Sequence, residues 1–288
     1  MEPVVEATAA EQRQRSHAGP HAAPEQPQDP QPLVFAHRGA SAALPEHTLA
    51  AYLRALDEGA DGVECDVRLT RDGHLVCVHD RRLERTSNGR GRVSAHTLDE
   101  LDQLDFGSWH GGDPARLLTL DRLVISLRQA GRPVRLLIET KHPSRFRGHV
   151  ERRLVALLHH HGLAEPAPGD PLQATVMSFS ALAVRRIRQL APALPTVLLL
   201  ELLPPGLWSD WPARHPHLAR LPFGTRIAGP GIELVRARPA LVPALHAAGN
   251  RVYVWTVNEP ADLDLVRRYR VDGIITDRPA ATLAALGR

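Results

Sequence analysis

Lysine, cysteine and long apolar runs are all scarce in this 288-residue sequence. Of its 35 basic residues 34 are Arg, and the one Lys is Lys141. A codon bias accounts for that scarcity, because Ala, Arg, Pro, Leu and Gly are abundant throughout the chain. This bias explains why Lys is rare, but it does not explain why the one Lys lies at position 141.

Charge, cysteine content and hydropathy exclude several classes of protein. A formal charge of +3, with basic residues spread singly or in pairs, provides no basic block to follow a nucleic-acid backbone. Two Cys cannot form a disulfide framework, which favours a reducing compartment. The best apolar run, Val197–Leu203, contains Glu201 and is far shorter than the roughly 18 to 20 residues that span a bilayer. We therefore expect a soluble, cytoplasmic protein with no transmembrane segment and no nucleic-acid partner.

Residues 1–31 differ in composition from the rest of the chain. They are rich in Ala, Gln, Pro and Glu and almost lack large apolar side chains, so they cannot bury enough surface to offset their ordering entropy. They also lack the basic and then apolar stretches of a secretory signal. The sequence predicts a disordered tail over 1–31 and one folded domain over 32–288.

From Leu33 onward, short β-type runs alternate with stretches of helical period, which is typical of repeated βα units. Strands are predicted at Leu33–Ala36, Val63–Leu69, His74–His79, Arg135–Glu139, Ala174–Ser178, Thr196–Leu200, Arg226–Ala228, Arg251–Thr256 and Gly273–Thr276. Helices are predicted at Thr48–Glu58, Leu120–Gln129, Val150–His160, Ala181–Leu190, Ala240–Ala248 and Pro260–Arg270.

This pattern favours an α/β fold, a TIM (β/α)8 barrel, although it contains one strand too many. The turn between Val63–Leu69 and His74–His79 is too short for a parallel crossover, so these two are expected to form a hairpin. Residues 80–116 are rich in Gly, Arg and Ser without a clear period, and we expect a small insertion there. A doubly wound sheet is the competing architecture, but no Gly-rich phosphate loop follows the first strand.

Polar residues collect at the predicted carboxyl ends of the strands, where TIM barrels place their active sites. Glu64 and Asp66 lie two apart on one strand and therefore share a face. Other strand ends contribute His37-Arg38, His79-Asp80, and Glu139 with Lys141. Each group alone has an ordinary explanation: a solvated strand face, a turn or an exposed ion pair. Their joint occurrence at what should be an apolar barrel mouth favours a functional site.

The residue types at these strand ends indicate phosphoester chemistry. Three carboxylates without a Cys or clustered His ligand set suit Mg2+ or Ca2+ better than Zn2+. His37 and His79 suit a general acid and a general base. Arg38 and Lys141 would neutralise an anionic group held near the metal ion.

Two series of short motifs occur in the order and spacing of a known family. The first comprises His37-Arg38-Gly39-Ala40, Leu44-Pro45-Glu46-His47-Thr48, Gly62-Val63-Glu64-Cys65-Asp66-Val67, Thr70-Arg71-Asp72-Gly73, Val78-His79-Asp80 and Leu83-Glu84-Arg85-Thr86-Ser87-Asn88-Gly89-Arg90-Gly91. The second comprises Ile138-Glu139-Thr140-Lys141, Ser178-Phe179, Val254-Trp255-Thr256-Val257-Asn258 and Asp272-Gly273-Ile274-Ile275-Thr276-Asp277-Arg278-Pro279. From about residue 33 to the C-terminus, the chain resembles the glycerophosphodiester phosphodiesterase family.

The resemblance implies a TIM-barrel enzyme that hydrolyses glycerophosphodiesters to glycerol 3-phosphate and an alcohol. It implies a divalent metal ion, Mg2+ or Ca2+, and an insertion at residues 80–116 that helps to cover the glycerol moiety. The site residues that it implies are the acid–base pair His37 and His79, the metal ligands Glu64, Asp66 and Glu139, the neighbouring Glu46, the phosphate-binding Arg38 and Lys141, and the pocket residues Phe179 and Trp255.

One motif departs from the family, which usually has Asn where this chain has His47. Either His47 replaces a hydrogen bond that ties the loop, or it alters the pH profile or the metal affinity of the site. The tract His159–His161 ends a helix, so it is interpreted as a solvated helix terminus. Cys65 and Cys77 are interpreted as small core residues.

Two other functions compete with the first. A lysophospholipase D would apply the same chemistry to a larger lipid. A noncatalytic phosphodiester-binding protein is the third interpretation, but a binder has no need of the pair His37 and His79.

Overall fold

The computed structural model describes residues 31–144, 147–201 and 220–288. The predicted tail, 1–31, lies outside the described residues except for its last position. The described unit extends over Pro32–Arg288.

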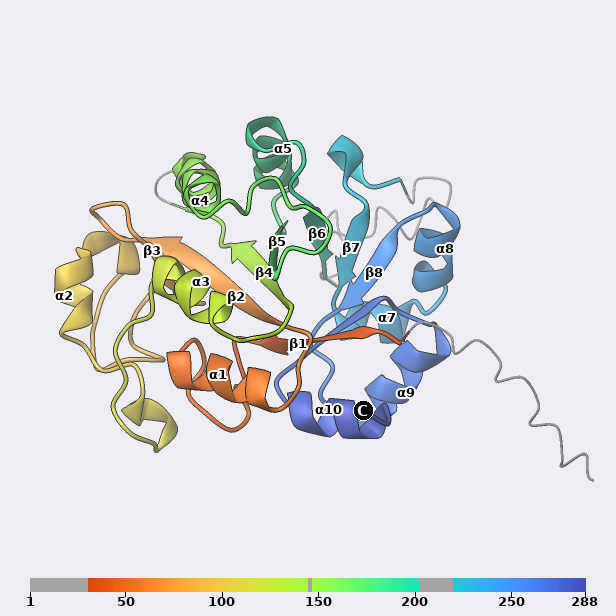
Figure 1. Cartoon of the computed structure of the whole chain (residues 1–288), viewed down its shortest axis with the longest axis horizontal. Helices are drawn as coiled ribbons and strands as arrows, with labels where there is room; N and C mark the ends of the chain where they lie inside the picture. Colours follow the sequence, from red (N-terminus) through yellow and green to blue (C-terminus); the bar gives the residue numbers. More distant parts are fainter. Residues whose placement is uncertain (1–30, 145–146, 202–219) are drawn as a thin grey trace, which may run out of the picture. The chain divides into compact units, whose positions relative to one another are not determined.

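Eight parallel strands close into a barrel, which confirms the predicted fold class and excludes the doubly wound alternative (Figure 1). The strands are β1 (Leu33–His37), β2 (Gly62–Leu69), β3 (Leu75–Cys77), β4 (Val134–Thr140), β5 (Leu172–Ser178), β6 (Thr196–Leu200), β7 (Ile227–Pro230), β8 (Arg251–Val254) and β9 (Gly273–Thr276). Closure comes from β1, which pairs with β9 on one side and with β2 on the other. The extra strand, β3, pairs antiparallel with β2, so the predicted hairpin is confirmed.

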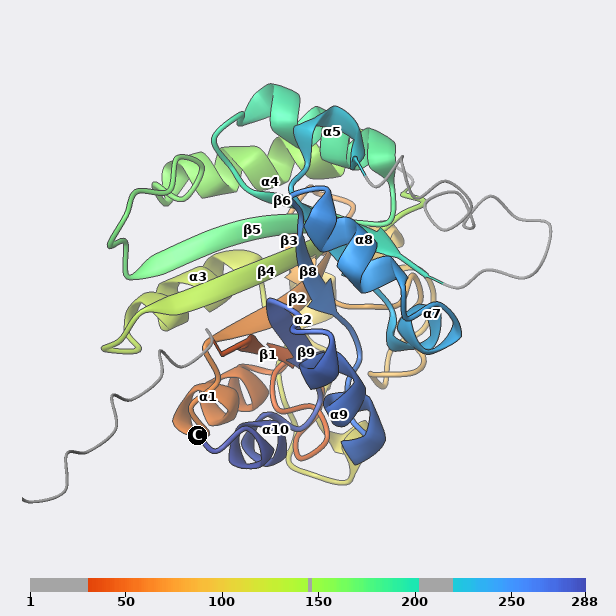
Figure 2. The same ribbon diagram turned by 90° about the vertical axis from the view of Figure 1, so that its right-hand side faces the viewer.

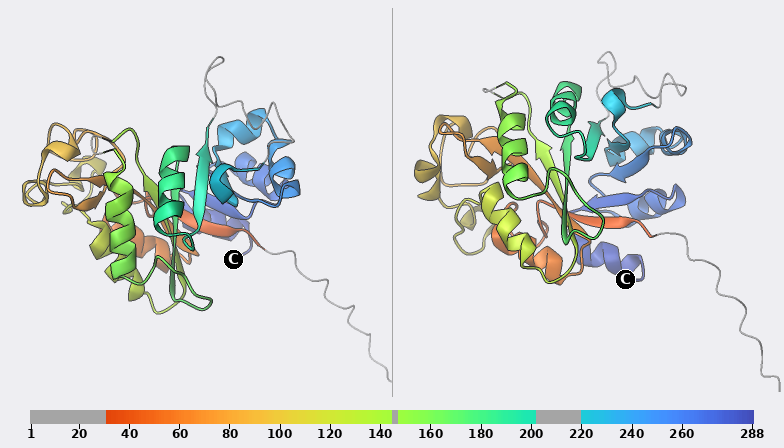
Figure 3. Two further views of the ribbon diagram at one scale, coloured as in Figure 1. Left: turned by 90° about the horizontal axis from the view of Figure 1, so that it is seen from above. Right: turned by 45° about the horizontal axis from the view of Figure 1, so that its top comes forward.

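Helices surround the strands, as Figures 2 and 3 show from other directions. They are α1 (Leu49–Asp57), α2 (Leu98–Asp102), α3 (Leu120–Arg128), α4 (His149–His160), α5 (Ala181–Leu190), α7 (Ile232–Ala237), α8 (Leu241–Ala247), α9 (Pro260–Arg268) and α10 (Pro279–Ala285). Side-chain caps fix several starts: the hydroxyl of Thr48 accepts a hydrogen bond from the backbone of Ala51 at the start of α1. Across the described residues, no helix is long and apolar enough to traverse a bilayer.

Side-chain alternation along the strands creates two cores. The cluster inside the barrel draws on strand residues only, and it comprises Phe35, Leu137, Met177, Val197, Leu199, Ile227, Tyr253 and Ile275. On β2, by contrast, Val63, Cys65 and Val67 belong to the cluster that packs against the outer helices. Glu64 and Asp66 therefore face the barrel interior, and the free cysteines Cys65 and Cys77 are core residues as predicted.

The segment Asp80–Arg116 has a small core of its own. Leu83, Val93, Leu101 and Phe106 are buried there, and they pack with Val76 of β3. It also contains α2, whose capping box pairs Thr97 with Glu100. This helix was not predicted, because its five residues are too few to show a helical period.

Candidate active site

The acidic cluster lies at the carboxyl ends of β2 and β4. Glu64 and Asp66 come from β2, and the β2–β4 register places Glu139 directly beside Asp66. One carboxylate oxygen from each of the three lies within 4.8 Å of the others, and all three residues are buried. Among the described residues no other group of three or more His, Cys, Asp or Glu is close enough to hold a metal ion.

Two cations contact the cluster. The Lys141 ammonium lies 3.2 Å from Asp66 Oδ1 and 2.7 Å from Glu139 Oε1. The Arg38 guanidinium lies 3.1 Å from Asp66 Oδ2 and 3.1 Å from Glu46 Oε1. The side chains of Glu139 and Lys141 are almost fully buried. They are therefore not an exposed surface ion pair, which was the nonfunctional explanation for these two residues.

These cations do not balance the buried negative charge. Burial, and then the nearby Asp66, raise the pKa of Glu64 well above its usual range. The same two causes raise the pKa of Glu139 to about 8 although Lys141 opposes them. Burial would raise the pKa of Asp66 as well, but Lys141, His47 and Arg38 outweigh it and hold that pKa well below its usual range. The cluster as a whole lacks positive charge.

The turn after β1 positions Arg38. Its φ is 58°, and the next residue, Gly39, has a φ of 87°. A Cβ at Gly39 would lie 2.7 Å from the backbone carbon of Ala51, so only glycine allows the turn to pack this closely on α1. The backbone N–H of Arg38 donates to Glu64 Oε2 at 3.2 Å. The turn thus connects Arg38, the candidate phosphate-binding residue, directly to Glu64 of the acidic cluster.

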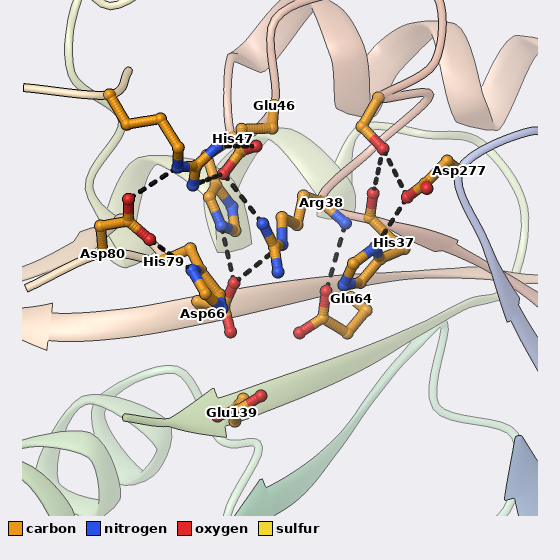
Figure 4. A network of polar contacts seen from close by, with 12 residues as sticks. His37, Arg38, Glu46, His47, Glu64, Asp66, His79, Asp80, Glu139 and Asp277 are labelled. Atoms are coloured by element: carbon orange, nitrogen blue, oxygen red, sulfur yellow. Dashed lines mark hydrogen bonds and ion pairs between the residues drawn. The ribbon is translucent and has the colours of Figure 1, made fainter. Parts of the chain in front are cut away.

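Two histidine–aspartate pairs lie on opposite sides of the Arg38 side chain (Figure 4). His37 Nδ1 is 2.7 Å from Asp277 Oδ1, and His79 Nδ1 is 2.6 Å from Asp80 Oδ1. Because an ionised carboxylate only accepts, each histidine carries its proton on Nδ1 and presents Nε2 to the site. Burial lowers the pKa of His79 to about 4, so its ring is neutral at pH 7.

Known proteins resemble this chain over nearly its whole length. Residues 37–281 match the model of the glycerophosphoryl diester phosphodiesterase family. A "Probable glycerophosphodiester phosphodiesterase 1" of Mycobacterium tuberculosis is 52% identical over 263 residues, which are 88% of this chain and 92% of that protein. A "Glycerophosphodiester phosphodiesterase" of Bacillus subtilis is 34% identical over 254 residues, 86% of this chain and 84% of the relative. The chain belongs to the glycerophosphoryl diester phosphodiesterase family.

A solved structure of an Oleispira antarctica phosphodiesterase, described as a complex with the product sn-glycerol-3-phosphate, supports the same assignment. It is 27% identical with a TM-score of 0.72, and the match covers 90% of this chain and 98% of that one. Membership of the family makes this chain an enzyme that acts on glycerophosphodiesters. The predicted recognition and enzyme class are confirmed.

The donor set fits the divalent metal ion that membership of this family implies. Its oxygen ligands are those that Mg2+ and Ca2+ prefer, and no sulfur or imidazole group competes within the acidic cluster. Among the described residues, the Glu64 carboxylate receives one hydrogen bond, from the Arg38 backbone. A divalent cation would add positive charge where three buried carboxylates face the two cations Arg38 and Lys141.

Two aromatic residues that the family resemblance placed in the pocket lie together at the ends of β5 and β8. The rings of Phe179 and Trp255 meet edge to face with centroids 5.4 Å apart. Trp255 Nε1 donates to the Gly229 carbonyl at 2.7 Å, which fixes its ring, while Phe179 is 38% exposed. The structure brings them together, although no contact with the acidic cluster is recorded.

Sequence reasoning missed three residues of this family member's site. Asp277 lies in the quoted motif but was given no role, and Arg85 and Tyr52 were not singled out either. Arg85 donates to Glu46 through both Nη atoms at 2.8 Å and to Asp80 Oδ2 through Nε at 2.6 Å. The quoted motifs around Asp277 and Arg85 carried a signal, whereas the contacts of Tyr52 become visible only in the folded chain.

Proposed function

We propose that this enzyme cleaves glycerophosphodiesters with a divalent cation held by Glu64, Asp66 and Glu139 and with His37 and His79 as acid and base. The observation that carries the proposal is a buried acidic cluster that lies close to two histidines, each fixed by its own aspartate. When bound, the cation supplies positive charge to the phosphate and acidifies the attacking hydroxyl.

Arg38 and Lys141 hold the substrate phosphate. Both side chains reach the acidic cluster, and they are the cations that contact it within the described part of the chain. The Oleispira antarctica structure is a complex with the product sn-glycerol-3-phosphate, which supports a ligand with an anionic phosphate for this chain as well. Phe179 and Trp255 form an apolar wall of the substrate pocket, and the segment Asp80–Arg116 covers the glycerol moiety.

The reaction proceeds in two steps. His79 takes the proton of the free glycerol C2 hydroxyl on Nε2, since its ring is neutral at pH 7. The oxygen attacks phosphorus, and the bond from phosphorus to the leaving alcohol breaks. His37, which enters this step with a second proton on Nε2, gives that proton to the leaving oxygen, and Arg38 and Lys141 stabilise the charge on the phosphoryl oxygens. Water then opens the cyclic phosphate with the histidine roles reversed. If a substrate without the C2 hydroxyl were turned over equally well, the cyclic route would be wrong, and water would attack phosphorus directly.

A substrate panel tests the proposed function. The full chain is assayed for glycerol 3-phosphate release from glycerophosphodiesters with different head groups, and for choline release from a lysophosphatidylcholine, with and without EDTA. We expect glycerol 3-phosphate from the first group, complete loss in EDTA and recovery with Mg2+ or Ca2+. Full activity in EDTA would contradict the metal assignment.

The same panel separates the alternatives. Choline release from the lysolipid alone would establish a lysophospholipase D, for which the exposed ring of Phe179 offers an apolar contact. Binding without any turnover would establish a noncatalytic protein. The two free, buried cysteines support a reducing compartment such as the cytoplasm as the site of action.

Lys141 provides a further test of the phosphate site. Its compact ammonium contacts two carboxylates at once, and the wide planar guanidinium of Arg does not have the same shape. We expect Lys141→Arg to lower kcat/KM about tenfold or more, although it keeps the charge. Steady-state kinetics with glycerophosphocholine measures the loss. Wild-type turnover would show that this one Lys has no role that Arg cannot fill.

A further inference from the structure

His47 lies in the turn between β1 and α1, and its backbone helps to hold that turn. The backbone N–H donates to the Arg38 carbonyl at 3.0 Å. Its φ is 61°, a left-handed conformation that Asn, Asp and His adopt more readily than other residues with side chains. The side chain of His47 makes two further contacts in addition to this backbone hydrogen bond.

The imidazole of His47 connects α1 to the acidic cluster. Nε2 lies 3.0 Å from Asp66 Oδ2, and Nδ1 lies 2.8 Å from the hydroxyl of Tyr52 on α1. Tyr52 is fully buried, and within the described part of the chain its hydroxyl has no other recorded hydrogen bond. Figure 4 shows the His47 ring pointing toward Asp66.

The chemistry of the two partners determines the tautomer. Asp66 is ionised and only accepts, so the proton of the ring is on Nε2. A neutral ring with its proton on Nε2 accepts at Nδ1, and the Tyr52 hydroxyl is the donor that faces it. Tyr52 thereby holds His47 in the form that donates to Asp66.

The two oxygens of Asp66 have different surroundings. Oδ2 accepts the hydrogen bond from His47 Nε2 and lies 3.1 Å from Arg38 Nε. Oδ1 lies 3.2 Å from the Lys141 ammonium, which also contacts Glu139. Oδ1 is therefore the oxygen on the side of Glu139. The contacts of His47 and Arg38 with Oδ2 together fix the rotation of the carboxylate that directs Oδ1 there.

We propose that His47, fixed by Tyr52, is a positioning residue that sets the affinity of the acidic cluster for its divalent cation. It holds Oδ2 of Asp66 so that Oδ1 stays available beside Glu139. The inference rests on the proposed function, because it requires that the cluster binds such an ion. It explains the one departure from the family motif as a contact to a metal ligand.

Two amide variants separate the contacts of His47. In Gln the amide nitrogen reaches about as far as Nε2 of His, whereas in Asn the amide group reaches only about as far as Nδ1. His47→Gln therefore keeps a hydrogen-bond donor for Asp66. His47→Asn keeps an amide group near the Tyr52 hydroxyl but loses the hydrogen bond to Asp66. Tyr52→Phe removes only the hydroxyl that holds the tautomer.

Isothermal titration of the full chain with Ca2+ and with Mg2+, after removal of bound metal, measures the effect. We expect His47→Asn to weaken cation binding about 10- to 100-fold, the usual cost of losing an outer hydrogen bond to a metal ligand. His47→Gln should stay within about threefold of wild type, and Tyr52→Phe should lie between the two. Thermal unfolding without metal provides the control, since a merely structural role would lower the midpoint of the variants and leave the cation affinity unchanged.

The outcomes distinguish this inference from the proposed function. Wild-type affinity in His47→Asn, or equal losses in His47→Asn and His47→Gln, would overturn the role of His47 while the metal site stands. A wild-type chain that binds neither Ca2+ nor Mg2+ would overturn both.

Discussion

His37 is 240 residues from its aspartate, whereas His79 directly precedes its own. Asp277 follows β9, and it reaches His37 because β9 pairs with β1 in the closed barrel. Asp80 needs no such closure. The two pairs nevertheless have nearly the same nitrogen–oxygen distance, 2.7 and 2.6 Å. The same arrangement of side chains is thus obtained once by barrel closure and once by local sequence.

The two aspartates differ in what holds them. Asp277 accepts from the Ser41 hydroxyl at 2.9 Å and from Asn258 Nδ2 at 2.5 Å, and both donors belong to the barrel mouth. Asp80 accepts from Arg85, which lies in the segment Asp80–Arg116. The pair of His79 therefore depends on how this segment packs, while the pair of His37 depends on the barrel itself.

The largest expected effect comes from the histidines, and it tests whether the two pairs contribute equally. His37→Ala and His79→Ala should each lower kcat about 10²- to 10⁴-fold, the usual contribution of a general acid or base. The measurement is steady-state kinetics with glycerophosphocholine, and circular dichroism confirms the fold. His159→Ala, an exposed position in the last turn of α4, is the matched control with activity near wild type. Near-normal activity in either variant would show that the substituted histidine is not a general acid or base, so that the two pairs do not contribute equally.

The aspartates should give the next largest effect and make the two pairs distinguishable. Asp277→Asn and Asp80→Asn should each lower kcat about 10- to 100-fold, because each replaces the charged acceptor that orients a histidine with a neutral amide, whose nitrogen donates and whose single oxygen accepts more weakly. Asp80→Asn should also raise KM, since Arg85 connects Asp80 through Glu46 to Arg38. Equal KM values in both variants would show that the segment Asp80–Arg116 does not communicate with the phosphate site.

Smaller effects are expected from the residues that hold the aspartates. Arg85→Lys should lower kcat/KM about tenfold, because Lys cannot reproduce the fork that contacts Glu46 and Asp80. Ser41→Ala should cost about threefold, since Asn258 still donates to Asp277. Arg82→Lys is the control: Arg82 is exposed and pairs with Glu84, so kinetics should be unchanged. A larger loss of kcat/KM in Ser41→Ala than in Arg85→Lys would show that the pair of His37 depends more on a single supporting contact than the pair of His79 does.

The smallest expected effect is on stability at low pH. Burial alone would raise the pKa of Asp277, but the hydrogen bond from His37 outweighs it, and the pKa falls to about 2. A lowered pKa stabilises the folded chain above the unfolded value of about 4, and this contribution is lost as the pH falls toward 2. Asp277→Asn should therefore cost about 1 kcal/mol at pH 6, after allowance for solvent screening, and less at pH 3. Urea unfolding at both pH values measures it, and a difference that does not depend on pH would contradict the assignment.

Local sequence predicted much of the barrel. The strands Thr196–Leu200 and Gly273–Thr276 and the helix Ala181–Leu190 have the predicted bounds, because period and turn residues agree there. The short helices α7 and α10 were not predicted, whereas the equally short α8 was predicted as Ala240–Ala248. The third predicted strand is shorter than expected, because only Leu75–Cys77 pairs with β2.

The sequence by itself determined which chemical groups are present and at which strand ends they lie. Strand alternation put Glu64 and Asp66 on one face, and chain order put Asp80 beside His79. Only the tertiary structure joined Asp277 to His37 and placed Glu139 and the one Lys beside Asp66. The physical reason is that local period and propensity act over a few residues, whereas these contacts depend on the register of strands that barrel closure brings together.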